Sequence, residues 1–419
     1  MVAGGCPVSA GGIDLVAELE RVKGACSATQ ARLVDAVRLS REVSAPQDAA
    51  RSVGSEVALA RRESPPCGDR FVRVARALVH DLPQTMAALT SGVCTEMHAV
   101  KVVESSSVLT RPADRTALDD RVGPLLGGLG VKAADAAARR VAAELDAAAV
   151  IARMEAAVRS RRVSVRAAAD GMGYLTVLGP MVEVAGAHAA LQARARSVVA
   201  GREDEPHGGR GIGAVAADTA LATLSGRAVG QVQPVEVHLV MTDRTLLGTG
   251  DPDRSVMEPA RVPGIGPVPA PVARWWLRGP HPATDDEATV WLRRLYTTPD
   301  GRDLAGMDSR RRTFTGLLRR MLILRDDLCT TPWCGAAIAH ADHATRSRDG
   351  GATDYTTGNG KCARCNLTKE APGWDTAITA EGLREVVVRT PLGRTYRTRP
   401  PPLLGWGSDI PPPDDTDVA

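Results

Sequence analysis

The sequence has few aromatic residues, little net charge and no long apolar run. Two Phe, four Tyr and six Trp occur among 419 residues, and no cluster of them offers a stacking surface for RNA bases. The formal net charge is only +3, so the overall charge does not indicate a nucleic-acid partner. No run of about 18 uncharged apolar residues is present, so we expect no membrane span. The first residues lack the basic and apolar segments of a secretion signal, which favours a cytoplasmic location.

The length and composition fit a soluble protein of more than one domain. The chain is 44% hydrophobic and 24% charged, and it is long enough for two or more domains. Residues 50–160 are rich in Ala, Arg and Leu at helical spacing, which predicts a mainly α-helical N-terminal domain. We expect five segments: 1–45, an N-terminal helix with a loose start; 46–262, a mainly helical domain; 263–300, a Pro/Gly-rich connector; 301–400, a domain that holds a cysteine cluster; and 401–419, a disordered tail.

The eight cysteines fall into two groups. Four are scattered, at Cys6, Cys26, Cys67 and Cys94. The other four form two close pairs, Cys329-x4-Cys334 and Cys362-x2-Cys365, with 27 residues between the pairs. Four thiolates complete the tetrahedral shell of a structural Zn²⁺ ion, which can hold together a domain whose own core is small. The alternatives are four unrelated buried thiols or two disulfides.

Candidate catalytic residues lie between and beside these pairs. Asp342 and His343 are adjacent, and on a strand their side chains would point to opposite sides. Asn366 directly follows the last cysteine and offers a neutral oxygen. A carboxylate and an amide oxygen suit Mg²⁺ or a similar divalent cation, and a neutral imidazole beside it can take a proton from water. These residues suffice for phosphodiester hydrolysis.

Basic residues surround the same stretch. Six arginines and no acid occur between Ser309 and Arg325, on a segment with one apolar helical face. Candidate contacts to DNA phosphates are Arg319, Arg320, Arg346, Arg348 and Lys369. A solvated arginine face explains the arginines of the helix equally well, and a structural role explains Lys369 equally well.

The run C-x4-C…H-A-D-H…G-G…N-G-K-C-x2-C-N-x2-K resembles the HNH endonuclease motif in its four-cysteine, zinc-containing form. The resemblance implies a ββα-metal fold, and hence an α+β multidomain protein with a helical N-terminal domain. It also implies that His343 is the general base, that Asp342 and Asn366 bind the catalytic metal, and that Asn359 holds the loop carrying the base. Members of the family cut DNA to leave 5′-phosphate and 3′-hydroxyl ends.

The longer layout resembles an actinobacterial family that joins an N-terminal domain of unknown function to a C-terminal HNH domain, sometimes called the thirteen-E-twelve repeat family. The chain departs from the HNH pattern at two places. Ala344, Thr345 and Arg346 follow the Asp-His pair where a β-branched residue and then a proline are usual. Gly360 and Lys361 follow Asn359 where an apolar Leu is common. Both departures would loosen the support of the base.

The sequence therefore predicts a metal-dependent DNA endonuclease, with double-stranded DNA as its partner. The alternative is a non-catalytic, zinc-stabilised DNA-binding protein. A binding module would have no need of Asp342, His343 and Asn366 together, so these three residues separate the two hypotheses.

Overall fold

The computed structural model describes residues 10–169, 172–203, 207–226, 239, 241, 259–262, 266–278, 314, 316–346, 350–379 and 384–401. The chain divides into two compact units. The first combines residues 1–153 with residues 297–402, and the second contains residues 154–296 and 403–419. The five segments expected from the sequence stay predictions.

The N-terminal part of the first unit is built from helices. They are α1 (Ala10–Ser44), α2 (Pro46–Arg61), α3 (Pro65–His80), α4 (Pro83–Thr90), α5 (Glu96–Ser106), α6 (Pro112–Val122), the 3-10 helix η1 (Gly123–Gly128) and α7 (Val131–Leu145). Helix α8 (Ala147–Val158) begins in this unit and ends in the second. Helices α2, α3, α4 and α6 carry proline in their first turn, where its missing N–H costs nothing. Their apolar faces meet in one core around Leu78, Leu82, Leu89 and Leu118. The expected helical N-terminal region is confirmed.

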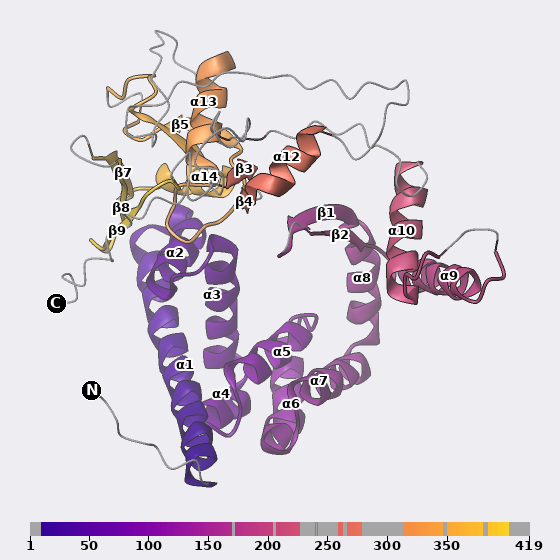
Figure 1. Ribbon diagram of the computed structural model, residues 1–419. Helices are drawn as coiled ribbons and strands as arrows, with labels where there is room; N and C mark the ends of the chain where they lie inside the picture. The colour runs from indigo at the N-terminus through magenta and orange to yellow at the C-terminus, as the bar shows by residue number, and fades with distance from the viewer. Residues whose placement is uncertain are drawn as a thin grey trace. The chain divides into compact units, whose positions relative to one another are not determined.

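Small antiparallel sheets and two helices form the C-terminal part of the same unit (Figure 1). The elements are α13 (Gly316–Asp326), β5 (His340–His343), β6 (Gly358–Lys361), α14 (Ala363–Lys369), β7 (Asp375–Ile378), β8 (Val386–Arg389) and β9 (Thr395–Thr398). Strand β5 pairs with β6, and β7, β8 and β9 form a second sheet in that order. The order β5, β6, α14 is the two-strand-and-helix arrangement that the sequence predicts.

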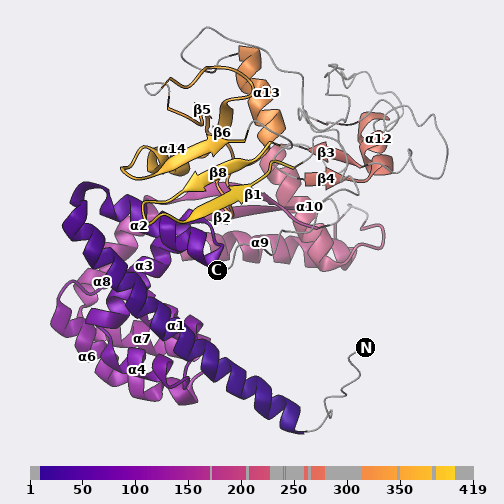
Figure 2. The same cartoon turned by 90° about the vertical axis from the view of Figure 1, so that its left-hand side faces the viewer.

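Helix α2 contributes to the core of the C-terminal part as well as to the helical core. Its residue Leu59 is buried in a cluster with Trp374, Val386 and Val388. In contrast to α2, the N-terminal part of α1 contributes to neither core, since all side chains from Ile13 to Lys23 are exposed. Figure 2 shows this end of α1 extending past the helices on which the rest of α1 lies.

The second unit contains a hairpin, two short strands and further helices. Its elements are β1 (Arg162–Ala167), β2 (Gly173–Leu178), α9 (Met181–Val199), α10 (Ile212–Ser225), β3 (Ala260–Val262), β4 (Gly266–Val268) and α12 (Ala270–Arg278). The described part of the expected connector, 263–300, thus forms β4 and α12. The expected tail lies outside the described residues except for residue 401. Among the described helices, none combines the length and the apolar character that a membrane crossing requires.

Candidate functional site

Helix α14 organises the site, because its seven residues face three different neighbours. Cys365 lies in a cluster with the other three paired cysteines. Lys369, four residues later, contacts Asp342 of β5. Arg364 contacts Asp69 of α3. One short helix therefore links the cysteine cluster, the candidate catalytic strand and the N-terminal helices.

Local backbone hydrogen bonds shape both cysteine pairs. In the first loop, Cys329 N donates to Ala336 O at 2.8 Å and Cys334 N donates to Thr331 O at 3.1 Å. In the second, Cys362 is the N-cap of α14, and its sulfur accepts from Cys365 N at 3.4 Å. An N–H group pointing at a sulfur favours the thiolate, the form that binds metal.

The four sulfur atoms are arranged as a metal site. They all lie within 4.8 Å of one another, with Cys334 Sγ 3.8 Å from Cys362 Sγ and 3.6 Å from Cys365 Sγ. Four sulfurs at the usual Zn–S distance of about 2.3 Å would be about 3.8 Å apart in a tetrahedron. Hydrogen bonds from the thiols of Cys334, Cys362 and Cys365 lower the pKa of Cys329. The sulfurs are too far apart for the predicted alternative of disulfides, and the cluster fits structural Zn²⁺.

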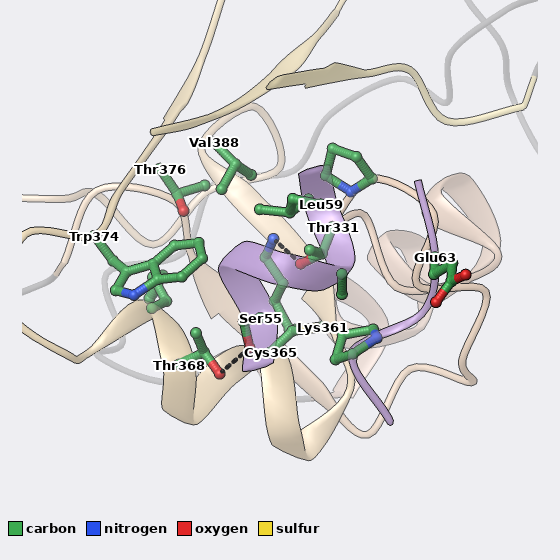
Figure 3. A pocket seen from close by; sticks show the side chains of 14 residues that line it. Ser55, Leu59, Glu63, Thr331, Lys361, Cys365, Thr368, Trp374, Thr376 and Val388 are labelled. Atoms are coloured by element: carbon green, nitrogen blue, oxygen red, sulfur yellow. Dashed lines mark hydrogen bonds between the residues drawn. The ribbon is translucent and has the colours of Figure 1, made fainter. Parts of the chain in front are cut away.

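A buried lysine lies beside this cluster. The side chain of Lys361 is fully buried, and its Nζ donates to Thr331 Oγ1 at 3.0 Å (Figure 3). Burial lowers the pKa of this lysine, while the nearby Cys329 and Cys365 favour its charged form. A Zn²⁺ ion with four thiolates carries two net negative charges, so an ammonium here offsets part of that charge. Sequence reasoning missed this role, although a lysine where an apolar residue is usual is a signal for it.

Asp342 and Lys369 form an ion pair between β5 and α14. Lys369 Nζ contacts Asp342 Oδ2 and also donates to His343 O at 2.5 Å. The side chain of Lys369 is only 4% exposed. Of the two roles open from the sequence, the structure therefore places Lys369 in a structural contact, and a contact with phosphate stays a prediction that would require Lys369 to leave Asp342.

The imidazole of His343 is held in place on the other side of β5. It is 7% exposed, a hydrogen bond of 2.7 Å joins its Nε2 to Thr353 Oγ1, and its ring centroid lies 4.8 Å from that of Phe314. The different neighbours of Asp342 and His343 agree with the alternation expected on a strand. Thr353 was not identified from the sequence, because nothing there marks which of several threonines faces the histidine.

The two candidate asparagines have different surroundings. Asn366 Oδ1 is buried, and it has no hydrogen-bond partner among the residues that the structure describes. Asn359 is fully buried opposite Asp342 in the β5–β6 ladder, and its Oδ1 accepts a hydrogen bond from Thr330 Oγ1. Asn359 thus joins β6 to the first cysteine loop, and its predicted link to the loop of the base stays a prediction. An orphaned buried oxygen at Asn366 suits a cation ligand.

Residues 13–326 match the family described as "Domain of unknown function (DUF222)". The chain belongs to the DUF222 family. The match ends at the last residue of α13, so it stops before the cysteine cluster, β5, β6 and α14. The expectation of an N-terminal domain of unknown function is confirmed. No curated protein and no solved structure matches the chain.

The end of the DUF222 region is structurally part of the C-terminal fold. Arg325, in the last turn of α13, is 2% exposed and donates to Gly358 O at 2.8 Å and to Asp326 Oδ2 at 2.9 Å. Asp326 Oδ2 in turn accepts from Gly360 N at 2.7 Å. Of the six arginines between Ser309 and Arg325, Arg325 is therefore not on an exposed basic face, because buried carbonyls and a carboxylate bind its guanidinium.

The other candidate DNA-contacting residues differ in their exposure and in their partners. Arg319 and Arg320 are exposed on α13 of the DUF222 region, and Arg319 NH2 donates to Ala339 O at 3.1 Å. Arg346 is half-buried and donates to Lys369 O at 2.6 Å, the carbonyl at the end of α14, so it fastens the loop after His343 to that helix. Arg348 lies outside the described residues.

The departures from the HNH pattern have a structural explanation. A Cβ at Gly360 would lie 2.5 Å from Ile338 Cδ1 and 3.2 Å from Asp326 Cβ, so glycine suits this tightly packed part of β6, and a larger residue would require Ile338 to move. Ala344 is buried, and its N–H donates to Thr357 O at 3.1 Å, which continues the β5–β6 pairing beyond His343. The residues that follow His343 are therefore tied to β6 through Ala344 and to α14 through Arg346.

Proposed function

We propose that the protein is a metal-dependent endonuclease that hydrolyses phosphodiester bonds of double-stranded DNA, like the HNH enzymes that its C-terminal motif resembles. The observation that carries the proposal is the convergence of β5 and α14. It brings an Asp–His pair on the first strand beside a helix that carries Asn366, whose buried oxygen lacks a described partner.

Asp342 and Asn366 would hold the divalent cation. Lys369 contacts one carboxylate oxygen of Asp342, so the other oxygen remains able to bind a cation. Oxygen ligands and open positions for water and phosphate suit Mg²⁺. When bound, such an ion stabilises negative charge on the phosphate and on the leaving oxygen.

His343 would act as the general base. Its imidazole accepts a proton from a water molecule, the water oxygen bonds to phosphorus, and the bond from phosphorus to the 3′ oxygen breaks. The hydrogen bond to Thr353 and the contact with Phe314 orient the ring for this transfer. The cysteine cluster takes no part in the chemistry and fixes the start of α14.

DNA would lie along the exposed arginines of α13. Arg319 and Arg320 present positive charge on a helix that packs on β6, next to the strand of the candidate base. Lys and Arg contacts to phosphates position DNA without reading its sequence, so binding should weaken steeply with salt.

A second candidate is a DNA-binding protein without catalytic activity. Two observations favour it: the ammonium of Lys369 already neutralises Asp342, and His343 is nearly buried. Under this hypothesis the cysteine cluster supports a binding surface, and the Asp–Lys pair is only a structural ion pair.

A plasmid-nicking assay decides between the two. The full-length protein is incubated with supercoiled plasmid in Mg²⁺ or Mn²⁺, beside His343→Ala and a reaction with EDTA. Metal-dependent nicking that disappears in His343→Ala supports the nuclease. An absence of nicking by protein that retains zinc and binds DNA would favour the binding module.

A further inference from the structure

The face of α14 turned away from Asp342 is bound by the N-terminal helices. The guanidinium of Arg364 contacts both carboxylate oxygens of Asp69 on α3, with NH2 2.7 Å from Oδ1. Thr368, one turn later on α14, has its Oγ1 3.3 Å from Oγ of Ser55 on α2 (Figure 3). Two side chains of one helical face thus meet two different N-terminal helices.

A close approach between α2 and α3 creates this binding face. A Cβ at Gly54 would collide with the carboxylate of Asp69, and a Cβ at Gly68 would collide with Gly54 O. The two glycines therefore let the helices cross closely enough for Asp69 of α3 and Ser55 of α2 both to contact Arg364. Larger residues at these positions would separate the partners that α14 uses.

The contact continues beyond α14 into the second C-terminal sheet. Trp374 Nε1, just before β7, donates to Ser52 Oγ at 2.8 Å, and Leu59 is buried with Val386 and Val388. Figure 3 shows Leu59 and Ser55 of α2 facing Thr368, Trp374 and Val388. Polar and apolar contacts together make α2 and α3 part of the C-terminal core.

We propose that α2 (Pro46–Arg61) and α3 (Pro65–His80) form a platform that holds α14 in place, and that Asp69 is a positioning residue for the candidate active site. A helix of seven residues is too short to be stable alone, so its orientation depends on what anchors it. The cysteine cluster anchors its start and Asp69 anchors its side. A tilt of α14 would move Asn366 and Lys369 relative to Asp342. This gives part of the DUF222 region a role as the support of the C-terminal site.

The effect on cleavage rests on the proposed nuclease function, whereas the anchoring of α14 does not. The test therefore uses the full-length protein and two kinds of measurement. Hydrogen exchange of the amides of 363–369, and transfer of zinc to a colorimetric chelator, report on α14 whatever the protein does. Nicking rate, KM for plasmid and the Mn²⁺ concentration for half-maximal rate report on the active site.

The main variant is Asp69→Asn, which keeps the shape of the side chain and removes its charge. The matched control is Asp114→Asn, which breaks another two-pronged pair, with Arg111, within the helical region. For Asp69→Asn we expect amide exchange in α14 and zinc transfer to rise about tenfold, the size expected for losing one charge-assisted hydrogen-bond pair. Nicking should slow and its Mn²⁺ requirement should rise, with the KM for plasmid unchanged.

Arg364→Lys serves as the conservative variant. It keeps the positive charge but loses the two-pronged geometry, so its exchange and zinc transfer should fall between wild type and Asp69→Asn. The proposal is overturned if Asp69→Asn and Asp114→Asn behave alike in exchange and zinc transfer. If the wild type does not nick DNA, the nuclease proposal fails, and exchange and zinc transfer still decide whether the platform holds α14.

Discussion

The two sides of the C-terminal site are built on opposite principles. The cysteine cluster is closed: its four ligands lie close together, and the backbone N–H of Cys365 and a buried lysine complement their charge. The Asp342 side is open: a buried amide oxygen of Asn366 lacks a described partner, and the carboxylate uses only one oxygen in its contact with Lys369. The comparison teaches that residues of one short helix can have opposite surroundings: the ligands around Cys365 are directed at one another, whereas the buried oxygen of Asn366 has no partner among the described residues.

The largest expected effect breaks the closed side. Cys365→Ala should lose the zinc ion and unfold the C-terminal part, because metal binding supplies much of the folding free energy of such small sites. Zinc content by mass spectrometry and thermal unfolding measure this. The matched control is Cys94→Ala: burial raises the pKa of Cys94 to about 11, so it is a neutral core thiol. The control should keep its zinc and lose only about 1 kcal/mol of stability.

The second prediction tests whether His343, on the Asp342 side of the site, acts in the reaction rather than in stabilising the fold. His343→Ala should slow nicking by about 10²- to 10⁴-fold, the contribution typical of a general base. Zinc content and DNA affinity should stay unchanged. His340→Ala is the control, since His340 lies on the same strand with an exposed side chain. Equal loss of nicking in both variants would contradict the assignment of His343.

The third comparison concerns the two asparagines. Asn366→Ala should raise the Mn²⁺ concentration needed for half-maximal nicking by about tenfold or more, because a metal ligand is lost. Asn359→Ala should instead lower the free energy of unfolding by about 1–3 kcal/mol, because it removes a buried hydrogen bond between the Thr330 hydroxyl and the Asn359 side chain. Titration of nicking with Mn²⁺ and denaturant unfolding measure the two effects. A reversal of the two outcomes would exchange their roles.

The smallest effect concerns the orientation of the base. Thr353→Val removes the hydroxyl beside His343 and keeps the shape of the side chain. A neutral hydrogen bond contributes about 0.5–1.5 kcal/mol, so nicking should slow about three- to tenfold. The measurement is the nicking rate across pH. The control is Thr357→Val in the same loop, which removes a hydroxyl that donates to Ala352 O and to Asp354 Oδ1 and not to His343. A loss as large as that of His343→Ala would assign Thr353 a direct part in the reaction.

The arrangement of the cysteine cluster was predictable from the sequence, whereas the contacts on the Asp342 side were predictable only in part. Thiolates of one metal must converge wherever they lie in the chain, so the spacing of Cys329, Cys334, Cys362 and Cys365 was sufficient. The β5–β6–α14 order followed from the motif. A charged residue, in contrast, does not reveal its partner. Arg346 was a candidate for phosphate contact, and for Lys369 a structural role was equally open; the structure shows Arg346 on a carbonyl of α14 and Lys369 on Asp342, and their contacts with phosphate stay predictions.

Contacts between residues far apart in the chain also could not be predicted from the sequence. Asp69 and Arg364 are 295 positions apart, and nothing in the composition of either segment links them. The same holds for Trp374 and Ser52, whose hydrogen bond joins the C-terminal part to α2. Such pairs depend on the packing of whole helices, which local periodicity does not determine.

The buried contacts of α13 bear on how such proteins can be recombined. The DUF222 match ends at Asp326, yet Arg325 and Asp326 bind the backbone of Gly358 and Gly360. A chimera joined directly after residue 326 would leave the buried Arg325–Asp326 ion pair on one parent. The β6 strand of the other parent would lose the donor to Gly358 O and the acceptor of Gly360 N. The segment that folds with the cysteine motif therefore includes α13, and also α2 and α3 through Ser52, Leu59 and Asp69, so a graft should carry these helices together with the motif.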